Sequence, residues 1–186
     1  RQSGAMARVT SQLTPSTTLI SITGFRRLDN QYVSDADVSD LDLLVSRIHE
    51  WQHQWSEELT VSQRHRRVTW VGGLFVFNEF DHQSVWVDQN ASRTQVQLDP
   101  HVNATSRAVF GETTIQLAPR LSGTVGLRYT REQKDIENRG GLHGLDGPMA
   151  PVAGSTYAYT DSIVHTAWTP RFATVSYTHL TLPTTS

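Results

Sequence analysis

The stretch "LSGTVGLRYTRE" (residues 121–132) alternates between apolar and polar side chains with a period of two. In an extended strand, successive side chains point to opposite faces, so this period separates two sets of residues. One set is apolar and the other polar: Leu121, Gly123, Val125, Leu127 and Tyr129 against Ser122, Thr124, Gly126, Arg128, Thr130 and Glu132. The stretch therefore predicts a long strand with one apolar face.

The segment just before it, "RAVFGETTIQL" (107–117), alternates in the same way. Its two sets are Val109, Gly111, Thr113, Ile115 and Leu117 against Phe110, Glu112, Thr114 and Gln116. Only "APR" (118–120) separates the two segments, and its proline favours a turn. Residues 107–132 are thus predicted to form one β-hairpin.

Two further hairpins follow the same pattern. Residues 8–13 and 18–29 flank the turn-like "TPST", and residues 56–63 and 68–80 flank "RHRR". The links between hairpins are long and polar, and we expect loops over residues 30 to about 50, 81–106 and 133–160. The Gly-rich stretch 140–147 lacks the spacing of a phosphate-binding loop and is expected to be flexible.

Strict alternation of short and long connections distinguishes between two all-β classes. A soluble sandwich has short strands and few loops beyond about 15 residues. A transmembrane β-barrel has strands of about 9–11 residues in the membrane, short periplasmic turns, long extracellular loops and apolar side chains facing lipid. The sequence favours the barrel, with Val109, Ile115, Leu117, Leu121, Val125, Leu127 and Tyr129 facing lipid and Glu112, Thr114, Gln116, Thr124, Arg128 and Glu132 facing the interior.

Composition excludes several classes of function. The 186 residues include 16 basic and 18 acidic side chains in an interspersed order, so no polybasic arm for nucleic acid is present. The absence of cysteine excludes disulfides, thiolate metal sites and thiol catalysis. The longest apolar run, "WVGGLFVF" (70–77), is too short for a transmembrane helix. No signal peptide is visible, and because the first residue is Arg1 we expect the chain to begin in mid-protein.

One motif points to different chemistry. His49, Glu50 and His53 spell H-E-x-x-H, which on a helix holds zinc and a catalytic glutamate. No G-x-x-H follows at metzincin spacing, and from Trp51 onward the residues alternate as in a strand. We therefore predict no catalytic, metal or cofactor site, with Trp51 and Trp55 as candidates for an interfacial aromatic girdle. A soluble zinc-dependent hydrolase and a secreted all-β binding module stay open as alternatives.

Four arginines, Arg26, Arg27, Arg128 and Arg131, are candidates to contact an anionic ligand inside or above a barrel. Such side chains also line solvated polar lumens. The sequence leaves both interpretations open.

The ordered segments "TLISITGFRRLDNQYVSDAD", "QHQWSEELTVSQ", "WVGGLFVFNEFDHQSV", "RAVFGETTIQLAPRLSGTVGLRYTREQKDIEN" and "WTPRFA" resemble the barrel domain of TonB-dependent outer-membrane receptors. The resemblance implies an all-β antiparallel meander of long hairpins, an open section of a 22-stranded transmembrane barrel to which this chain contributes six or seven strands. It also implies energy-coupled uptake of a nutrient such as a ferric siderophore. The implied partners are outer-membrane lipid, a plug domain and TonB, the last two binding through regions outside this chain.

The final residues differ from the rest. "VSYTHLTLPTTS" (175–186) carries no acidic or basic residue and is similar to translated sequencing-adapter read-through. We therefore expect the barrel section to cover residues 1–173 and a non-native tail to cover residues 174–186.

Overall fold

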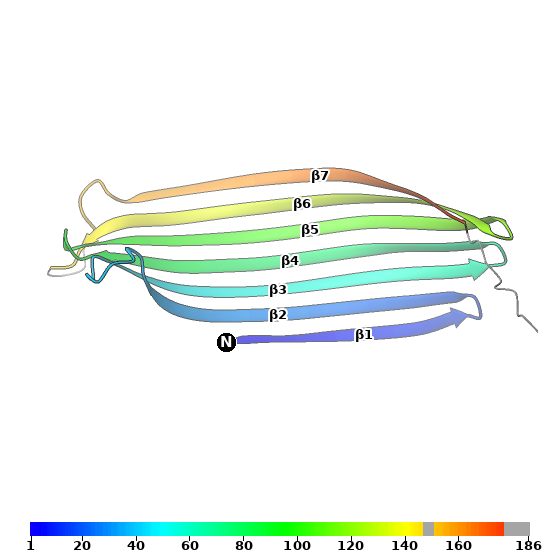
Figure 1. The fold of residues 1–186 in the computed structure, drawn as a ribbon, viewed down its shortest axis with the longest axis horizontal. Coiled ribbons are helices and arrows are strands. Elements are labelled where there is room, and N and C mark those ends of the chain that lie inside the picture. Colours follow the sequence, from blue (N-terminus) through cyan, green and yellow to red (C-terminus); the bar gives the residue numbers. More distant parts are fainter. Residues whose placement is uncertain (147–150, 177–186) are drawn as a thin grey trace, which may run out of the picture.

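A computed structural model describes residues 1–146 and 151–176, which form a single antiparallel sheet (Figure 1). Its strands are β1 (Gln2–Thr14), β2 (Thr17–Asp35), β3 (Leu44–His65), β4 (Val68–Gln89), β5 (Thr94–Ala118), β6 (Leu121–Gly144) and β7 (Tyr157–Ser176). Each strand pairs with the next one along the chain. This confirms the predicted antiparallel meander and the predicted number of strands. No helix in the described part of the chain is long and apolar enough to cross a membrane.

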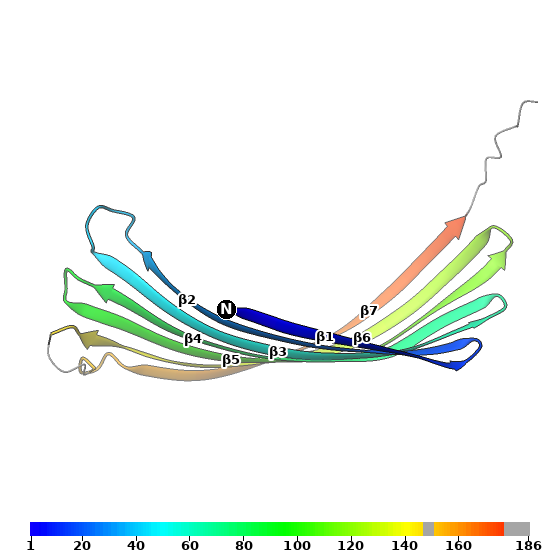
Figure 2. The same cartoon turned by 90° about the horizontal axis from the view of Figure 1, so that it is seen from below.

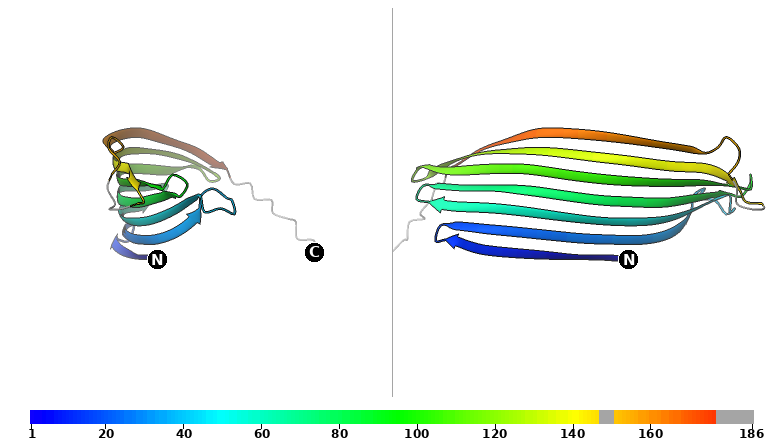
Figure 3. Two further views of the ribbon diagram at one scale, coloured as in Figure 1. Left: turned by 90° about the vertical axis from the view of Figure 1, so that its left-hand side faces the viewer. Right: turned by 180° about the vertical axis from the view of Figure 1, so that it is seen from behind.

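The sheet is open and curved. Among the described residues, β1 pairs only with β2 and β7 pairs only with β6, so these two strands form free edges. The strands bow along their length (Figure 2), and the sheet is arched in cross-section (Figure 3). Closure requires the first and last strands to meet with consistent shear, which a few strands of a wide barrel cannot achieve. The prediction of an open partial barrel wall is therefore confirmed.

Tight turns join the strands of each predicted hairpin. They lie at residues 15–16, 66–67 and 119–120, inside the predicted stretches "TPST", "RHRR" and "APR". Arg66 lies in the left-handed region of backbone conformation, at φ 46°. A left-handed residue suits a two-residue connection between twisted antiparallel strands.

The three long loops predicted between the hairpins are much shorter in the structure. Strands continue far into them, and the actual connections cover only residues 36–43, 90–93 and 145–156. The sequence signal was lost because apolar alternation requires one face to meet an apolar medium. Where both faces meet water, the backbone ladder continues without that pattern.

The Gly-rich stretch is also largely strand. Gly140 pairs with Leu98 of β5 and with Tyr157 of β7. A Cβ atom at Gly140 would lie 2.6 Å from the carbonyl oxygen of Gln97 and 2.7 Å from the Tyr157 ring. This glycine permits close packing of three strands, so the expectation of a flexible loop is wrong at this position.

Residues 1–146 and 151–176 form no second layer on the sheet, and its burial reflects this. Within the described ranges, the only buried apolar residues are Ala104 and Ala108. A single layer stabilised mainly by its hydrogen-bond ladders must gain further burial from lipid or from other protein segments. This is the burial expected of a barrel wall seen alone.

The predicted tail boundary is not settled by the fold. Thr174 and Val175 belong to β7, where they pair with Gly123 and Ser122 of β6. Residues 177–186 lie outside the described residues. The assignment of 174–186 to a non-native tail stays a prediction.

Candidate functional site on the two faces of the sheet

The register of β5 and β6 assigns the paired side chains of the central hairpin to two faces. Thr113 lies opposite Val125, and Val109 lies opposite Tyr129, on what we call the apolar face. Thr114 lies opposite Thr124 on the other side, which we call the polar face. The partition predicted for residues 107–132 is therefore confirmed, because all its members fall on the expected sides of one sheet.

The apolar face continues across all strands at the end of the sheet that carries the tight turns. Val125 of β6 is 58% exposed, which is unusual for a valine that is paired with strands on both sides. The register places the following large apolar side chains on this face: Val9, Leu19, Phe25, Trp55, Leu59, Val61, Trp70, Leu74, Val76, Val109, Ile115, Leu121, Val125, Leu127, Trp168 and Phe172. A band of this kind on one face is the lipid-contacting surface of a membrane barrel.

Aromatic side chains occur at the edge of this band that lies away from the tight turns. Tyr129 and Trp168 lie opposite each other on β6 and β7, with ring centroids 4.8 Å apart. Trp55 lies on the same face and is 41% exposed, in agreement with its predicted place in a girdle. Trp51 lies further along β3 and stacks on His82 at 5.0 Å instead. The sequence did not predict the Tyr129–Trp168 pair, because the predicted loop over residues 133–160 left the register between β6 and β7 undefined.

One acidic residue interrupts the apolar band. Glu57 lies on the apolar face, between Leu59 and Trp55 along β3. Its carboxylate accepts hydrogen bonds from the hydroxyls of Ser21, at 2.6 Å, and Thr23. These two donors satisfy an ionisable group at a position where lipid would offer none.

The polar face carries the interior-type side chains. Arg171 of β7 forms an ion pair with Glu112 of β5 at 2.7 Å. The Arg128 guanidinium carbon lies 5.6 Å from the ring centroids of both Phe75 and Phe110, a cation–π arrangement. Such fixed charges on one face are expected where that face meets a water-filled or plug-filled lumen.

The four candidate arginines do not converge. Arg26 and Arg128 lie on the polar face, whereas Arg27 and Arg131 lie on the apolar face. Residues adjacent in a strand necessarily point to opposite sides. These arginines therefore do not form one ligand site.

The H-E-x-x-H motif is not helical, because residues 48–59 lie within β3. His49 and His53 share a face, but four residues of strand separate them by about 13 Å, too far for one zinc ion. Glu50 points to the opposite face, His49 is bonded to Asp29 at 2.9 Å, and His53 lies beside Phe80. The zinc-hydrolase alternative is therefore wrong.

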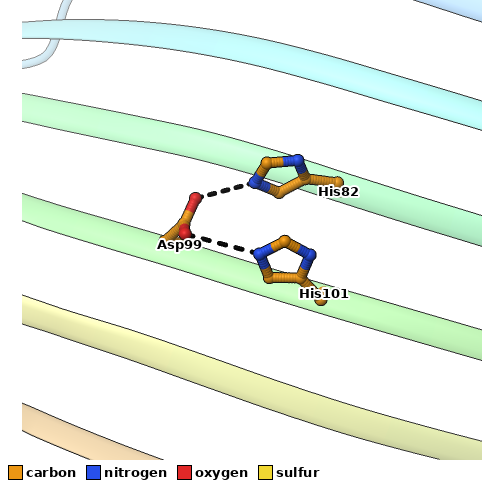
Figure 4. A group of neighbouring side chains, drawn as sticks. All are labelled: His82, Asp99 and His101. Atoms are coloured by element: carbon orange, nitrogen blue, oxygen red, sulfur yellow. Dashed lines mark hydrogen bonds and ion pairs between the residues drawn. The ribbon is translucent and has the colours of Figure 1, made fainter.

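The structure brings together a group that the sequence analysis missed. His82 of β4 and His101 of β5 lie directly opposite each other on the side of the sheet that carries the apolar band, and Asp99 contacts both (Figure 4). Asp99 and His101 are two residues apart and so share a face, which is a usable signal. The sequence does not reveal the cluster, because residues 81–106 lack the alternation of a lipid-facing strand and are predicted to form a loop.

Polar contacts stabilise the connections at the end of the sheet opposite the tight turns. The Asp37 carboxylate accepts hydrogen bonds from the Ser39 hydroxyl and from the backbone N–H of Leu44, which lower the pKa of Asp37 below its ordinary value. An Arg93–Asp146 ion pair joins two different connections, and its hydrogen bonds lower the pKa of Asp146. These contacts hold Asp37 and the Arg93–Asp146 pair in defined positions at this end of the sheet, where a ligand surface could be built.

Comparison with known proteins agrees with this geometry. Residues 5–184 match the family described as TonB dependent receptor-like, beta-barrel. No curated protein matches the sequence. Among solved structures, the chain is similar to the crystal structure of the ferric yersiniabactin uptake receptor FyuA from Yersinia pestis, with a TM-score of 0.72 and 15% identity. The match covers 93% of this chain and 25% of that receptor, so the chain spans about a quarter of its length.

The family match covers nearly the whole chain, and the fold, the apolar band and the polar face all agree with it. The secreted-module alternative is thereby excluded. The chain belongs to the TonB-dependent receptor β-barrel family and is a section of an outer-membrane barrel wall.

Proposed function

We propose that this chain is part of a receptor that takes up a nutrient such as a ferric siderophore across the outer membrane, using energy supplied through TonB. The observation that carries the proposal is the two-faced seven-stranded sheet, apolar on one side and charged on the other, in a chain of this family. TonB-dependent receptors are transporters and not enzymes.

In this proposal the apolar face contacts lipid and the polar face lines the lumen. The Arg128 cation–π cluster and the Arg171–Glu112 pair would then contact the plug domain or the water around it. The plug domain and the TonB-binding segment belong to regions outside this chain. The chain by itself therefore transports nothing.

The choice of a ferric siderophore rests on similarity of fold. The FyuA structure is that of a ferric yersiniabactin uptake receptor, and at 15% identity it supports the shape of the wall and not the identity of the ligand. An iron chelate is the substrate class to test first.

The test uses the full-length receptor that contains this chain, produced in a host strain without its own ferric-siderophore receptors. Uptake is measured with a panel of siderophores carrying radioactive iron, and with labelled cobalamin and saccharides as other nutrient classes. Each measurement is repeated in a strain that lacks TonB. We expect uptake of at least one iron chelate that disappears without TonB.

Two results would contradict the proposal. Uptake that persists without TonB would show passive diffusion through a pore. Uptake of cobalamin or a saccharide alone would retain the transport function and overturn the assignment of an iron chelate.

A further inference from the structure

The His82–Asp99–His101 cluster lies on the outside of the wall and beyond the lipid band. It shares a face with Leu74 and Val109, which belong to that band. His82 lies about 14 residues beyond Val68, or about 46 Å along a strand at roughly 3.3 Å per residue. At a strand tilt of about 45° this is about 33 Å along the membrane normal, more than the apolar band of about 25 Å. The cluster therefore stands above the hydrocarbon and outside the lumen.

Three ligand-type atoms converge in the cluster (Figure 4). His82 Nε2 lies 2.7 Å from Asp99 Oδ1, and His101 Nε2 lies 3.4 Å from Asp99 Oδ2. One donor atom from each residue lies within 4.8 Å of the other two. In a tetrahedral site with bonds of about 2.0–2.2 Å, ligand atoms are about 3.3 Å apart. The two distances from the Asp99 oxygens to the histidine nitrogens, 2.7 Å and 3.4 Å, are close to that value.

Neighbouring side chains hold these ligands in place. Trp51 of β3 stacks on the His82 ring, with ring centroids 5.0 Å apart. Ser84 donates a hydrogen bond to Asp99 Oδ1 at 3.0 Å. The His82, Asp99 and His101 side chains retain only 23%, 33% and 32% of their exposure. Ligands held by stacking and hydrogen bonds lose less freedom when they bind an ion.

The carboxylate is not committed to a fixed cation. Across residues 1–146 and 151–176, the ion-pair partners of Asp99 are His82 and His101, and no arginine or lysine pairs with it. Other acidic residues on the sheet do have arginine partners, as Asp88 has Arg47. The negative charge of Asp99 is therefore available to a cation that the His82 and His101 imidazoles also bind.

We propose that His82, Asp99 and His101 bind one divalent transition metal ion on the outer surface of the receptor. Two imidazoles and one carboxylate suit Zn²⁺ and its neighbours, whereas Mg²⁺ and Ca²⁺ prefer oxygen ligands alone. Three protein ligands leave at least one coordination position open to the exterior. In this structure the His82 and His101 rings are nearly parallel, with centroids 3.8 Å apart and an interplanar angle of 15°. Both rings would rotate to direct a nitrogen at the ion when it binds.

This site goes beyond the proposed transport function. It uses neither histidine of the H-E-x-x-H motif, and it lies on the opposite face from the lumen. An ion bound there is not cargo on the transport path. Loss of the site is expected to leave nutrient uptake unchanged.

The test measures Zn²⁺ binding to the full-length receptor in detergent by competition with a chromophoric chelator. The variants are His82→Ala, His101→Ala and the near-isosteric Asp99→Asn. His53→Ala is the matched control, because His53 lies on the same face beside Phe80 but outside the cluster. Heat-modifiable gel mobility confirms that each variant has folded.

We expect the wild type and His53→Ala to bind one more Zn²⁺ per receptor than the cluster variants. Asp99→Asn keeps the shape of the side chain, and we expect its affinity to fall at least tenfold. Millimolar Mg²⁺ should not displace the ion. Bound Co²⁺ should give a visible absorption band that is absent in His82→Ala.

The proposal is overturned if His82→Ala and His101→Ala bind Zn²⁺ with the same number and affinity as the wild type. It is equally overturned if His53→Ala loses as much binding as they do. Should the alanine variants fail to fold, unchanged binding by folded Asp99→Asn overturns it as well.

Discussion

Thr114 and Thr124 lie directly opposite each other on β5 and β6, and their hydroxyl oxygens are 2.8 Å apart. The next residue, Val125, points to the other side of the sheet, where it lies opposite Thr113. Thr124 and Val125 are therefore neighbours in the chain at almost the same depth in the membrane, but Thr124 lies on the polar face and Val125 on the lipid-contacting face. Substituting each with the same residue tests the effect of the face while the depth stays constant.

We predict that Val125→Arg impairs barrel assembly in the full-length receptor, whereas Thr124→Arg does not. An arginine on the lipid face near the bilayer midplane costs about 2–4 kcal/mol. On the polar face it loses only the hydrogen bond to Thr114, worth about 1 kcal/mol. Outer-membrane levels and heat-modifiable mobility of the two variants are compared side by side. The opposite ranking would mean that the faces are assigned the wrong way round.

Two neighbouring glycines give a second prediction. A Cβ atom at Gly73 would lie 2.7 Å from the Leu59 carbonyl oxygen and 2.5 Å from the Phe110 ring, whereas at Gly72 the closest atom is 3.6 Å away. Gly73→Ala should therefore destabilise the barrel by about 1–3 kcal/mol through overpacking. Gly72→Ala should be neutral or slightly stabilising. Thermal or urea unfolding in detergent measures both, and equal effects would contradict the close packing of Phe110 over Gly73.

A third prediction concerns Glu57 on the lipid face. Replacing its two donors together, by Ser21→Ala and Thr23→Val, should destabilise the receptor by about 1–3 kcal/mol, because the carboxyl group is left unsatisfied. In a Glu57→Leu background the same pair should cost little, because no carboxyl group remains. The difference is the coupling energy of a double-mutant cycle. Equal costs in both backgrounds would show that the two hydroxyls do not act through Glu57.

The sequence was sufficient where one face of a strand meets lipid. The hairpin 107–132 was predicted with its turn and both faces, because the apolar medium imposes a period of two. The same rule explains why Arg26 and Arg27 could not serve one site, since adjacent residues point apart. Sequence reasoning stopped where strands leave the membrane, because water accepts polar residues on both faces.

That limit explains why the His82–Asp99–His101 cluster was not predicted. His82 and His101 are 19 positions apart, and only the register of β4 against β5 shows that they lie opposite each other. Register in this region is fixed by hydrogen bonding continued from the membrane part and by the short connection at residues 90–93. Neither can be derived from the sequence of residues 81–106, which predicts a loop.

The free edges of the sheet lead to the last prediction. In the part of the chain that the structure describes, β1 and β7 each present a row of backbone N–H and C=O groups without a partner strand. In hydrocarbon each unsatisfied group costs several kcal/mol, so only closed barrels cross membranes as β-structure. With only Ala104 and Ala108 as buried apolar residues, the described sheet has no core to offset this cost.

We therefore predict that residues 1–186 produced alone, with a secretion signal, do not assemble in the outer membrane and do not support uptake. The full-length receptor, produced from the same promoter, is the control and should give a folded band that shifts on heating. Fractionation should recover the chain alone as degraded or aggregated material, because β1 and β7 are open to pairing with other chains. A heat-modifiable species in the outer-membrane fraction, formed by the chain alone, would contradict this, since it would mean that seven strands close or associate into a wall without the rest of the receptor.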